Sequence, residues 1–170
     1  QHATASRAVQ QLQGLHLLYY QDDHEHDHAH DHHHLPGAVD THLWLAPHNA
    51  LIIARQIATD LSKLDAANAA DYQLNLHSFE QRLQAADAQI RQQLAAIGKR
   101  PFFVFHEAIN YFEHSYQLEH AGVFAINPEV QPGAKHLHKM RLQLQQAGTS
   151  CILTEPPAPP ARPRARRARR

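Results

Sequence analysis

Apolar residues repeat at helical spacing through the middle of the chain. The longest pattern runs over residues 69–97, where the apolar positions are three or four apart: Tyr72, Leu76, Phe79, Leu83, Ala86, Ile90, Leu94 and Ile97. This spacing puts them on one face of a helix, and Gly98 follows where a left-handed cap ends one. At about 1.5 Å per residue the helix would be roughly 40 Å long. We therefore expect a helix long enough to link two lobes.

A helix is also predicted to begin at Pro47, because proline is tolerated in a first turn. Its expected buried face is formed by Leu51, Ile52, Ile57, Leu61 and Leu64. Nearer the N-terminus, residues 3–13 are compatible with a short helix that has Val9 and Leu12 inward. The apolar run at residues 15–20 is compatible with a strand.

Strands and helices alternate after residue 100. Residues 101–105 (PFFVF), 123–126 and 151–154 are predicted strands, and residues 108–117 and 133–147 are predicted helices. Leu137, Met140 and Leu144 are expected to face inward from the second of these helices. Alternation of this kind predicts an α/β fold with a parallel sheet.

The apolar pattern stops over residues 21–39. Residues 24–34 read HEHDHAHDHHH and contain seven histidines, at His24, His26, His28, His30, His32, His33 and His34. We interpret residues 21–39 as a mobile loop, because Leu35, Pro36 and Gly37 punctuate its end. Ordering such a loop costs about 1 to 2 kcal/mol per residue, so we expect weak, multi-site metal binding there. A solvated charged loop and a pH-sensitive linker are the alternatives.

The zero formal net charge hides an asymmetry. Six of the sixteen basic residues lie in the last nine positions, which leaves ten basic against sixteen acidic residues in the rest of the chain. An acidic body argues against a nucleic-acid surface on the folded part. The arginine-rich tail remains a candidate for salt-dependent contact with nucleic acid or membrane. No apolar run approaches the roughly 20 residues needed to cross a bilayer.

Two histidines are candidate metal ligands. His106 follows PFFVF at the predicted carboxyl end of a strand, where ligands gather in parallel sheets. His42 lies in DTHLWLAP, just before a predicted helix, so we expect both imidazoles to face one cleft. Neutral imidazole is a common zinc ligand. Taken alone, His106 is equally well explained as a structural histidine that caps a strand.

The remaining histidines outside the run are predicted to have ordinary structural or solvent contacts. His16 and His48 show no supporting partner in the sequence, and His136 and His138 are expected on different helix faces. Ordinary solvation on helix surfaces is expected for His77, His114 and His120.

Several motifs occur together in a characteristic order. They are DTHLWLAP at residues 40–47, FVFHEAINYFE at 103–113, INPEVQPGAKHLHKMR at 126–141 and CILTEP at 151–156. With the histidine-rich insertion before them, they resemble the zinc-specific periplasmic solute-binding proteins of bacterial high-affinity zinc ABC importers, members of the metal-binding cluster of solute-binding proteins. The resemblance covers residues 24–156.

This resemblance implies a two-lobed α/β metal-receptor fold with parallel sheets and a long inter-lobe helix. We expect a partial N-terminal lobe at residues 1–68 with the loop at 21–39, a linking helix at 69–98, a partial C-terminal lobe at 99–155 and a disordered tail at 156–170. It further implies a non-enzymatic periplasmic protein that captures Zn²⁺ and delivers it to a membrane permease.

The resemblance also implies residue roles. His42 and His106 match the family's zinc ligands, and a histidine at the position of His106 favours zinc, because related manganese receptors carry a carboxylate there. Glu107 is expected as a partner behind the ligands. The seven run histidines match an accessory loop that gathers or senses zinc.

The chain departs from the family at both ends. The family's first zinc histidine lies in an N-terminal segment without a counterpart here, and PAPPARPRARRARR replaces the end of the second lobe. The cysteine matching Cys151 normally pairs with one in that end. We therefore expect a fragment whose truncated lobes expose apolar strand edges. A zinc buffer acting through the run, and a metallohydrolase using a two-histidine zinc, are the alternatives.

Overall fold

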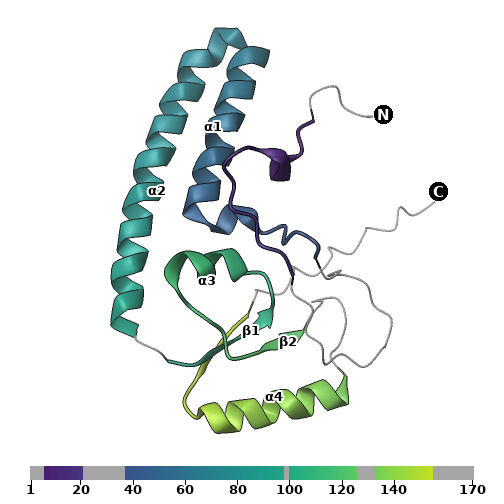
Figure 1. Cartoon of the computed structure of the whole chain (residues 1–170). Coiled ribbons are helices and arrows are strands. Elements are labelled where there is room, and N and C mark those ends of the chain that lie inside the picture. The colour runs from purple at the N-terminus through teal and green to yellow at the C-terminus, as the bar shows by residue number, and fades with distance from the viewer. Residues whose placement is uncertain (1–5, 21–36, 98–99, 126–132, 155–170) are drawn as a thin grey trace, which may run out of the picture.

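The computed structural model describes residues 6–20, 37–97, 100–125 and 133–154. This part of the chain contains four α-helices and three strands, and Figure 1 shows how they are arranged. In chain order the elements are α1 (Pro47–Leu64), α2 (Ala69–Ile97), β1 (Phe102–His106), α3 (Asn110–Tyr116), β2 (Val123–Ala125), α4 (Ala134–Ala147) and β3 (Cys151–Leu153). Short 3-10 turns occur at Val9–Gln11, Leu43–Leu45 and Ala66–Asn68.

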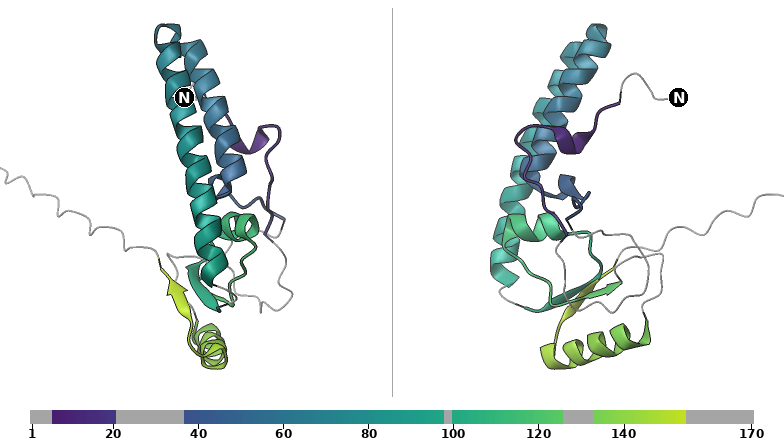
Figure 2. Two further views of the ribbon diagram at one scale, coloured as in Figure 1. Left: turned by 90° about the vertical axis from the view of Figure 1, so that its left-hand side faces the viewer. Right: turned by 45° about the vertical axis from the view of Figure 1, so that its right-hand side comes forward.

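Helices α1 and α2 form a hairpin that extends beyond the rest of the molecule (Figures 1 and 2). The predicted start of α1 at Pro47 is confirmed. Its predicted buried face is wrong in the second half, where Ile57 is 52% and Leu64 70% exposed. The outer part of α1 packs mainly against α2, so one helix cannot cover that whole face. Ala58 is the buried residue at this level.

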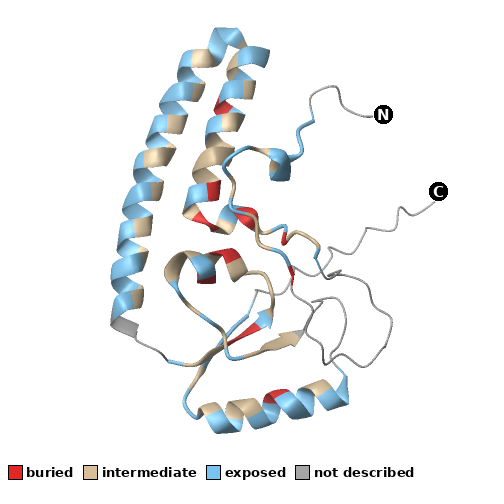
Figure 3. Cartoon of the chain, viewed as in Figure 1, coloured by how far each residue is buried: buried red, intermediate tan, exposed pale blue. Residues whose placement is uncertain are grey.

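The long helix is confirmed, since α2 has 29 residues. Its predicted stripe lies against α1 but is only half-buried, and Ala86 is exposed. Figure 3 shows no fully buried residue from position 69 to 95. Gly98, the predicted cap, lies outside the described residues.

The predicted α/β class and parallel sheet are also confirmed. The sheet has the order β2-β1-β3, and both neighbours run parallel to β1. β1 begins one residue later than predicted and ends at His106. Phe103 is fully buried in this central strand, because it is covered on both sides of the sheet, and Val104 is 2% exposed.

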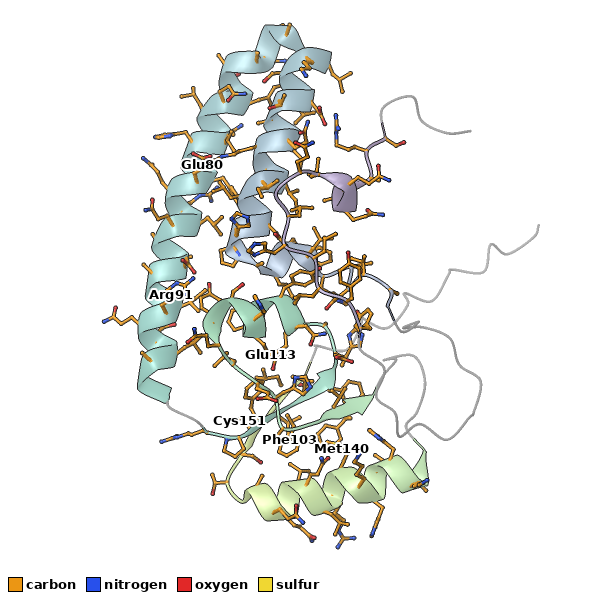
Figure 4. All side chains as sticks on the ribbon, viewed as in Figure 1. Glu80, Arg91, Phe103, Glu113, Met140 and Cys151 are labelled. Atoms are coloured by element: carbon orange, nitrogen blue, oxygen red, sulfur yellow. The ribbon has the colours of Figure 1, made fainter. Side chains whose placement is uncertain are left out.

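Helix α4 packs on the sheet through Met140, which is 2% exposed (Figure 4). The packing is close at Gly122, where an added Cβ would lie 2.9 Å from the Met140 Cε. The prediction that Leu137 faces inward is wrong, because this side chain is 46% exposed. The edge strand β3 exposes Ile152 and Leu153, as expected for an incomplete lobe, and Cys151 there is an exposed free thiol.

The N-terminal predictions need correction. Only Val9–Gln11 forms a 3-10 turn where a helix was expected over residues 3–13, because an isolated short helix with two apolar residues is marginally stable. The expected strand at 15–20 does not join the sheet; Tyr19 instead forms an isolated antiparallel bridge with Val39. Residues 1–5, the histidine run and the tail from residue 155 lie outside the described residues. Among the helices that the structure describes, none has the length and hydrophobicity to cross a bilayer.

Candidate metal centre

A buried carboxylate holds His42. Asp40 is fully buried and accepts hydrogen bonds from the His42 backbone N–H at 2.9 Å and from the ring Nδ1 at 2.7 Å. Since a carboxylate accepts, Nδ1 carries the proton in neutral imidazole, and the lone pair is on Nε2. A carboxylate behind an imidazole also raises its basicity as a metal ligand. His42 is therefore prepared to donate Nε2 to a cation.

The structure brings His42 and His106 together from distant parts of the sequence. His106 is the last residue of the central strand β1, and the two ring centroids are 5.7 Å apart, with an interplanar angle of 76°. Zinc–nitrogen bonds of 2.0 to 2.1 Å place each centroid about 3.2 Å from a shared ion, so a tetrahedral angle gives a separation of about 5 Å. The observed pair is close to this distance.

A hydrogen-bond network behind Asp40 connects the site to α3. Asn110 Nδ2 donates to Asp40 Oδ2 at 3.1 Å and lies 3.2 Å from Glu107 Oε1. The Tyr111 hydroxyl donates to the Asp40 carbonyl oxygen at 2.9 Å and accepts from the Leu18 N–H at 2.9 Å. Glu107 thus connects to His42 through Asn110 and Asp40.

The phenols near this network stay protonated. Burial and the negative charge of Asp40 raise the pKa of Tyr20, and burial raises the pKa of Tyr111. Tyr111 therefore remains a hydrogen-bond donor at physiological pH. Sequence reasoning missed Asp40, Asn110 and Tyr111 as parts of the site; the position of Asp40 two residues before His42 was the available signal, because a short Asp side chain bonds to the backbone two residues on.

Trp44 marks the rim of the pair. The Trp44 side chain is 57% exposed, and its ring centroid is 5.8 Å from that of His42. It is the only tryptophan of the chain. Its fluorescence is therefore a local reporter for events at His42.

Backbone hydrogen bonds join the two segments that flank residues 21–36. Tyr20 N–H donates to the Ala38 carbonyl at 3.0 Å, Gly37 N–H to the Tyr20 carbonyl at 2.9 Å, and Asp40 N–H to the Leu18 carbonyl at 2.9 Å. The prediction of a loop through residue 39 is therefore wrong at its end, because residues 37–39 are fixed by these bonds. The seven run histidines, His24 to His34, lie outside the described residues. The described chain thus stops at Tyr20 and resumes at Gly37, and Ala38, which bonds to Tyr20, is two residues before Asp40.

In the described parts of the chain, no group of three or more His, Cys, Asp or Glu side chains is arranged to hold a metal ion. His42 and His106 are thus a two-imidazole arrangement. Zinc sites usually have three or four protein donors, or three with an open position. No third His, Cys, Asp or Glu donor to this pair is found among the described residues.

The prediction that His120 is solvated on a helix surface is wrong. Its Nδ1 lies 2.9 Å from both carboxylate oxygens of Glu113, which is 6% exposed on α3. The hydrogen bond to Glu113 raises the pKa of His120, against the opposing effect of burial. The chain returns to Glu113 through Gln117, which ends α3 with φ of 55°.

The prediction for His16 and His48 is also wrong, since both have partners. Asn49 binds the backbone N–H and carbonyl of His16, and His48 Nε2 lies 2.9 Å from the Gly14 carbonyl oxygen. His136 Nε2 donates to the Val123 carbonyl at 2.8 Å. The other predicted solvated side chains are exposed: His77, His114 and His138.

Comparison with known proteins gives a consistent result. The family model described as ZnuA, zinc-uptake complex component A, periplasmic, matches residues 1–168. The high-affinity zinc uptake system protein ZnuA of Brucella abortus (strain 2308) is 33% identical over 120 residues, which are 71% of this chain and 36% of that protein. The protein of the same name from Yersinia pestis is 38% identical over 140 residues, covering 82% of this chain and 41% of that protein.

Structural similarity points the same way. A crystal structure of a Zn(II)-bound variant of AdcAII from Streptococcus pneumoniae has a TM-score of 0.59 and 26% identity, over 68% of this chain and 43% of that one. The chain thus spans less than half the length of each of these three proteins.

Proposed function

The chain belongs to the family of periplasmic zinc-uptake complex components, and on this premise we propose that it captures Zn²⁺ through His42 and His106 and delivers it to the membrane permease of an ABC importer. Zn²⁺ is the cargo of this protein and the periplasm its place of action. The family is one of non-enzymatic binding proteins, as the sequence analysis expected. The metallohydrolase alternative is therefore wrong.

The pairing of His42 and His106 next to a fully buried carboxylate is the observation that carries the proposal. Asp40 fixes the tautomer of the neutral His42 ring, so its lone pair is on Nε2, the nitrogen that would bind the ion. Imidazole nitrogen suits zinc better than it suits the hard cations Mg²⁺ and Ca²⁺. The zinc bound to the related AdcAII variant supports this choice of cargo.

We further propose a third donor from outside the described residues. The chain covers only 36% and 41% of the two ZnuA relatives, and the uncovered length of those relatives is one source of such a donor. The division into two incomplete lobes joined by α2 belongs to the same proposal, with α2 as the rigid connection.

The run at residues 24–34 acts as an accessory to this site in our proposal. The backbone bonds of Tyr20 to Gly37 and Ala38, and of Asp40 to Leu18, support this role, because they hold together the two segments that flank residues 21–36. The alternative is a zinc buffer in which the run itself is the main site. The two functions differ in which residues carry the tightest affinity.

The proposal is tested by zinc titration against a chromogenic chelator, with Trp44 fluorescence as the local readout. We expect His42→Ala with His106→Ala to abolish the tightest site and the zinc-dependent rise in melting temperature, because only a ligand of the folded form stabilises it. The fluorescence response of Trp44 to zinc should be lost as well.

His77→Ala with His138→Ala is the matched control, since it removes two exposed histidines far from the pair. The control should bind and melt like the original chain. An unchanged tightest affinity in the His42 and His106 variant would refute the proposed ligands. If that affinity disappears only when the run is replaced, the buffer function is correct.

A further inference from the structure

We propose that His16 and His48 form a second, separate binding site for a divalent transition metal ion such as Zn²⁺. The two ring centroids are 5.1 Å apart, and the rings are tilted by 38°. This separation equals the distance of about 5 Å expected for two imidazoles that share a tetrahedral ion. Neither residue belongs to the His42 and His106 pair.

Hydrogen bonds hold the backbone of His16 and the ring of His48. Asn49 is fully buried; its Oδ1 accepts from the His16 N–H at 2.9 Å, and its Nδ2 donates to the His16 carbonyl at 2.8 Å. His48 is the second residue of α1, and its Nε2 is 2.9 Å from the Gly14 carbonyl oxygen. Little further ordering of these two chain segments is therefore needed when an ion binds.

The hydrogen bond of His48 selects its tautomer. A carbonyl oxygen only accepts, so Nε2 carries the proton and Nδ1 of the neutral ring has the lone pair. For His16, no ring hydrogen bond to another residue is found among the parts of the chain that the structure describes, so a ring nitrogen is available.

The surroundings admit an ion without a charge conflict. His16 and His48 are exposed and line a cavity of about 680 Å³ between α1, α2 and α3, which His114 also lines. The charged residues of the wall are paired: Arg55 with Glu80 at 2.8 Å and Arg91 with Asp87 at 3.2 Å. Figure 4 shows Glu80 and Arg91 along α2 on the side of this cavity.

The expected site is weaker than a cage, because no third His, Cys, Asp or Glu of the described chain converges on it. Water from the cavity would complete the coordination shell. Imidazole pairs with open positions suit zinc, nickel and copper, whereas Mg²⁺ and Ca²⁺ prefer oxygen donors. We therefore expect zinc to bind and Mg²⁺ to leave the pair unaffected.

The test counts zinc by calorimetry in the full chain with the seven run histidines replaced by serine. His16→Gln with His48→Gln should lose one equivalent of zinc and keep the response of Trp44. His77→Gln with His138→Gln is the control and should lose none. Calorimetry counts each zinc equivalent separately. The variant with His42→Ala and His106→Ala should therefore keep the equivalent that His16 and His48 bind. This result distinguishes the present proposal from the proposed function.

A second measurement locates the ion. In long-range proton–nitrogen NMR spectra, zinc should shift Nδ1 of His48 and one ring nitrogen of His16, and Mg²⁺ should shift neither. An unchanged stoichiometry in the His16 and His48 variant, or ring resonances that do not respond to zinc, would overturn the proposal.

Discussion

Two histidine pairs of similar separation are built in different ways. His42 and His106 are 5.7 Å apart and join two distant chain segments, and a buried carboxylate stands behind one of them. His16 and His48 are 5.1 Å apart on exposed surface, and a backbone carbonyl stands behind one of them. Ring separation alone therefore does not rank the two proposed sites by affinity.

The physical difference is the charge of the group behind the imidazole. A carboxylate that accepts from Nδ1 stabilises the positive charge that the ring gains when it binds a cation, and burial strengthens this effect. A neutral carbonyl fixes the tautomer but contributes less electrostatically. We therefore expect the tighter zinc affinity at His42 and His106, and the predictions below test this ranking.

The largest effect is expected for Asp40→Asn, which removes the charge and keeps the shape. Zinc affinity at His42 should fall about 10- to 100-fold, the usual cost of losing such an outer partner. The zinc equivalent assigned to His16 and His48 should not change. Chelator competition measures the first, and calorimetry the second.

Asp60→Asn is the matched control, because Asp60 pairs with Arg7 on the surface and away from both pairs. It should leave both affinities intact. An equal loss of affinity at the two pairs in Asp40→Asn would contradict the ranking by charge.

Tyr111→Phe should act on the scaffold of the first pair. It leaves the Leu18 N–H and the Asp40 carbonyl without their partner, since both bond to the Tyr111 hydroxyl at 2.9 Å. Unsatisfied buried groups of this kind cost about 1 to 3 kcal/mol of unfolding free energy. Urea unfolding measures the loss, and Tyr19→Phe at an exposed position should show almost none. A loss no larger than that of Tyr19→Phe would mean that the hydrogen bonds of Tyr111 do not stabilise the fold.

His120→Gln tests a carboxylate-backed imidazole that has no second imidazole. Glu113 raises the pKa of His120, and Glu107 and Glu119 add to the effect. Protonated His120 therefore stabilises the fold below the ordinary histidine pKa of about 6.5, and this contribution is lost as pH rises through the raised value. We expect about 1 kcal/mol at pH 5.5, declining toward zero by pH 9.

The measurement compares the melting temperatures of His120→Gln and the original chain across this pH range. His114→Gln, an exposed neighbour on α3, should show no such pH dependence. A difference that is constant with pH would show that protonation of His120 does not contribute. Zinc affinity should be equal in both variants.

The smallest effect on the tight site is expected when serine replaces the seven run histidines. The weak zinc equivalents should disappear, whereas the tightest dissociation constant should change less than about threefold, because it is set by the prebuilt pair. Calorimetry resolves the two classes. A large loss of the tightest affinity would instead show that a run histidine completes the His42 and His106 site.

Much of the fold follows from periodicity alone. The spacing of three and four that begins at Tyr72 predicts α2 within a residue, and the apolar run around Phe103 predicts the central strand, since local pattern determines both. The inward face of α1 was not predictable past Ile57, because its burial depends on how far the hairpin extends beyond the sheet.

The site was predictable only in part. Motif position suggested His42 and His106, and the structure brings their rings together. The partners Asn110 and Tyr111 depend on where α3 packs, which no local signal in the sequence specifies. The same holds for His16 and His48, which meet only because Asn49 fixes the segment before the run.

The bonds between Tyr20 and residues 37–38 have a kinetic consequence. They close the sixteen residues 21–36 into a loop with fixed ends. If an imidazole of residues 24–34 holds zinc, as we propose, the ion that it releases would meet His42 within the same molecule, and linked binding groups give effective concentrations in the millimolar range. Transfer inside one molecule would then outpace capture from dilute solution, and its rate would not depend on how much protein is present.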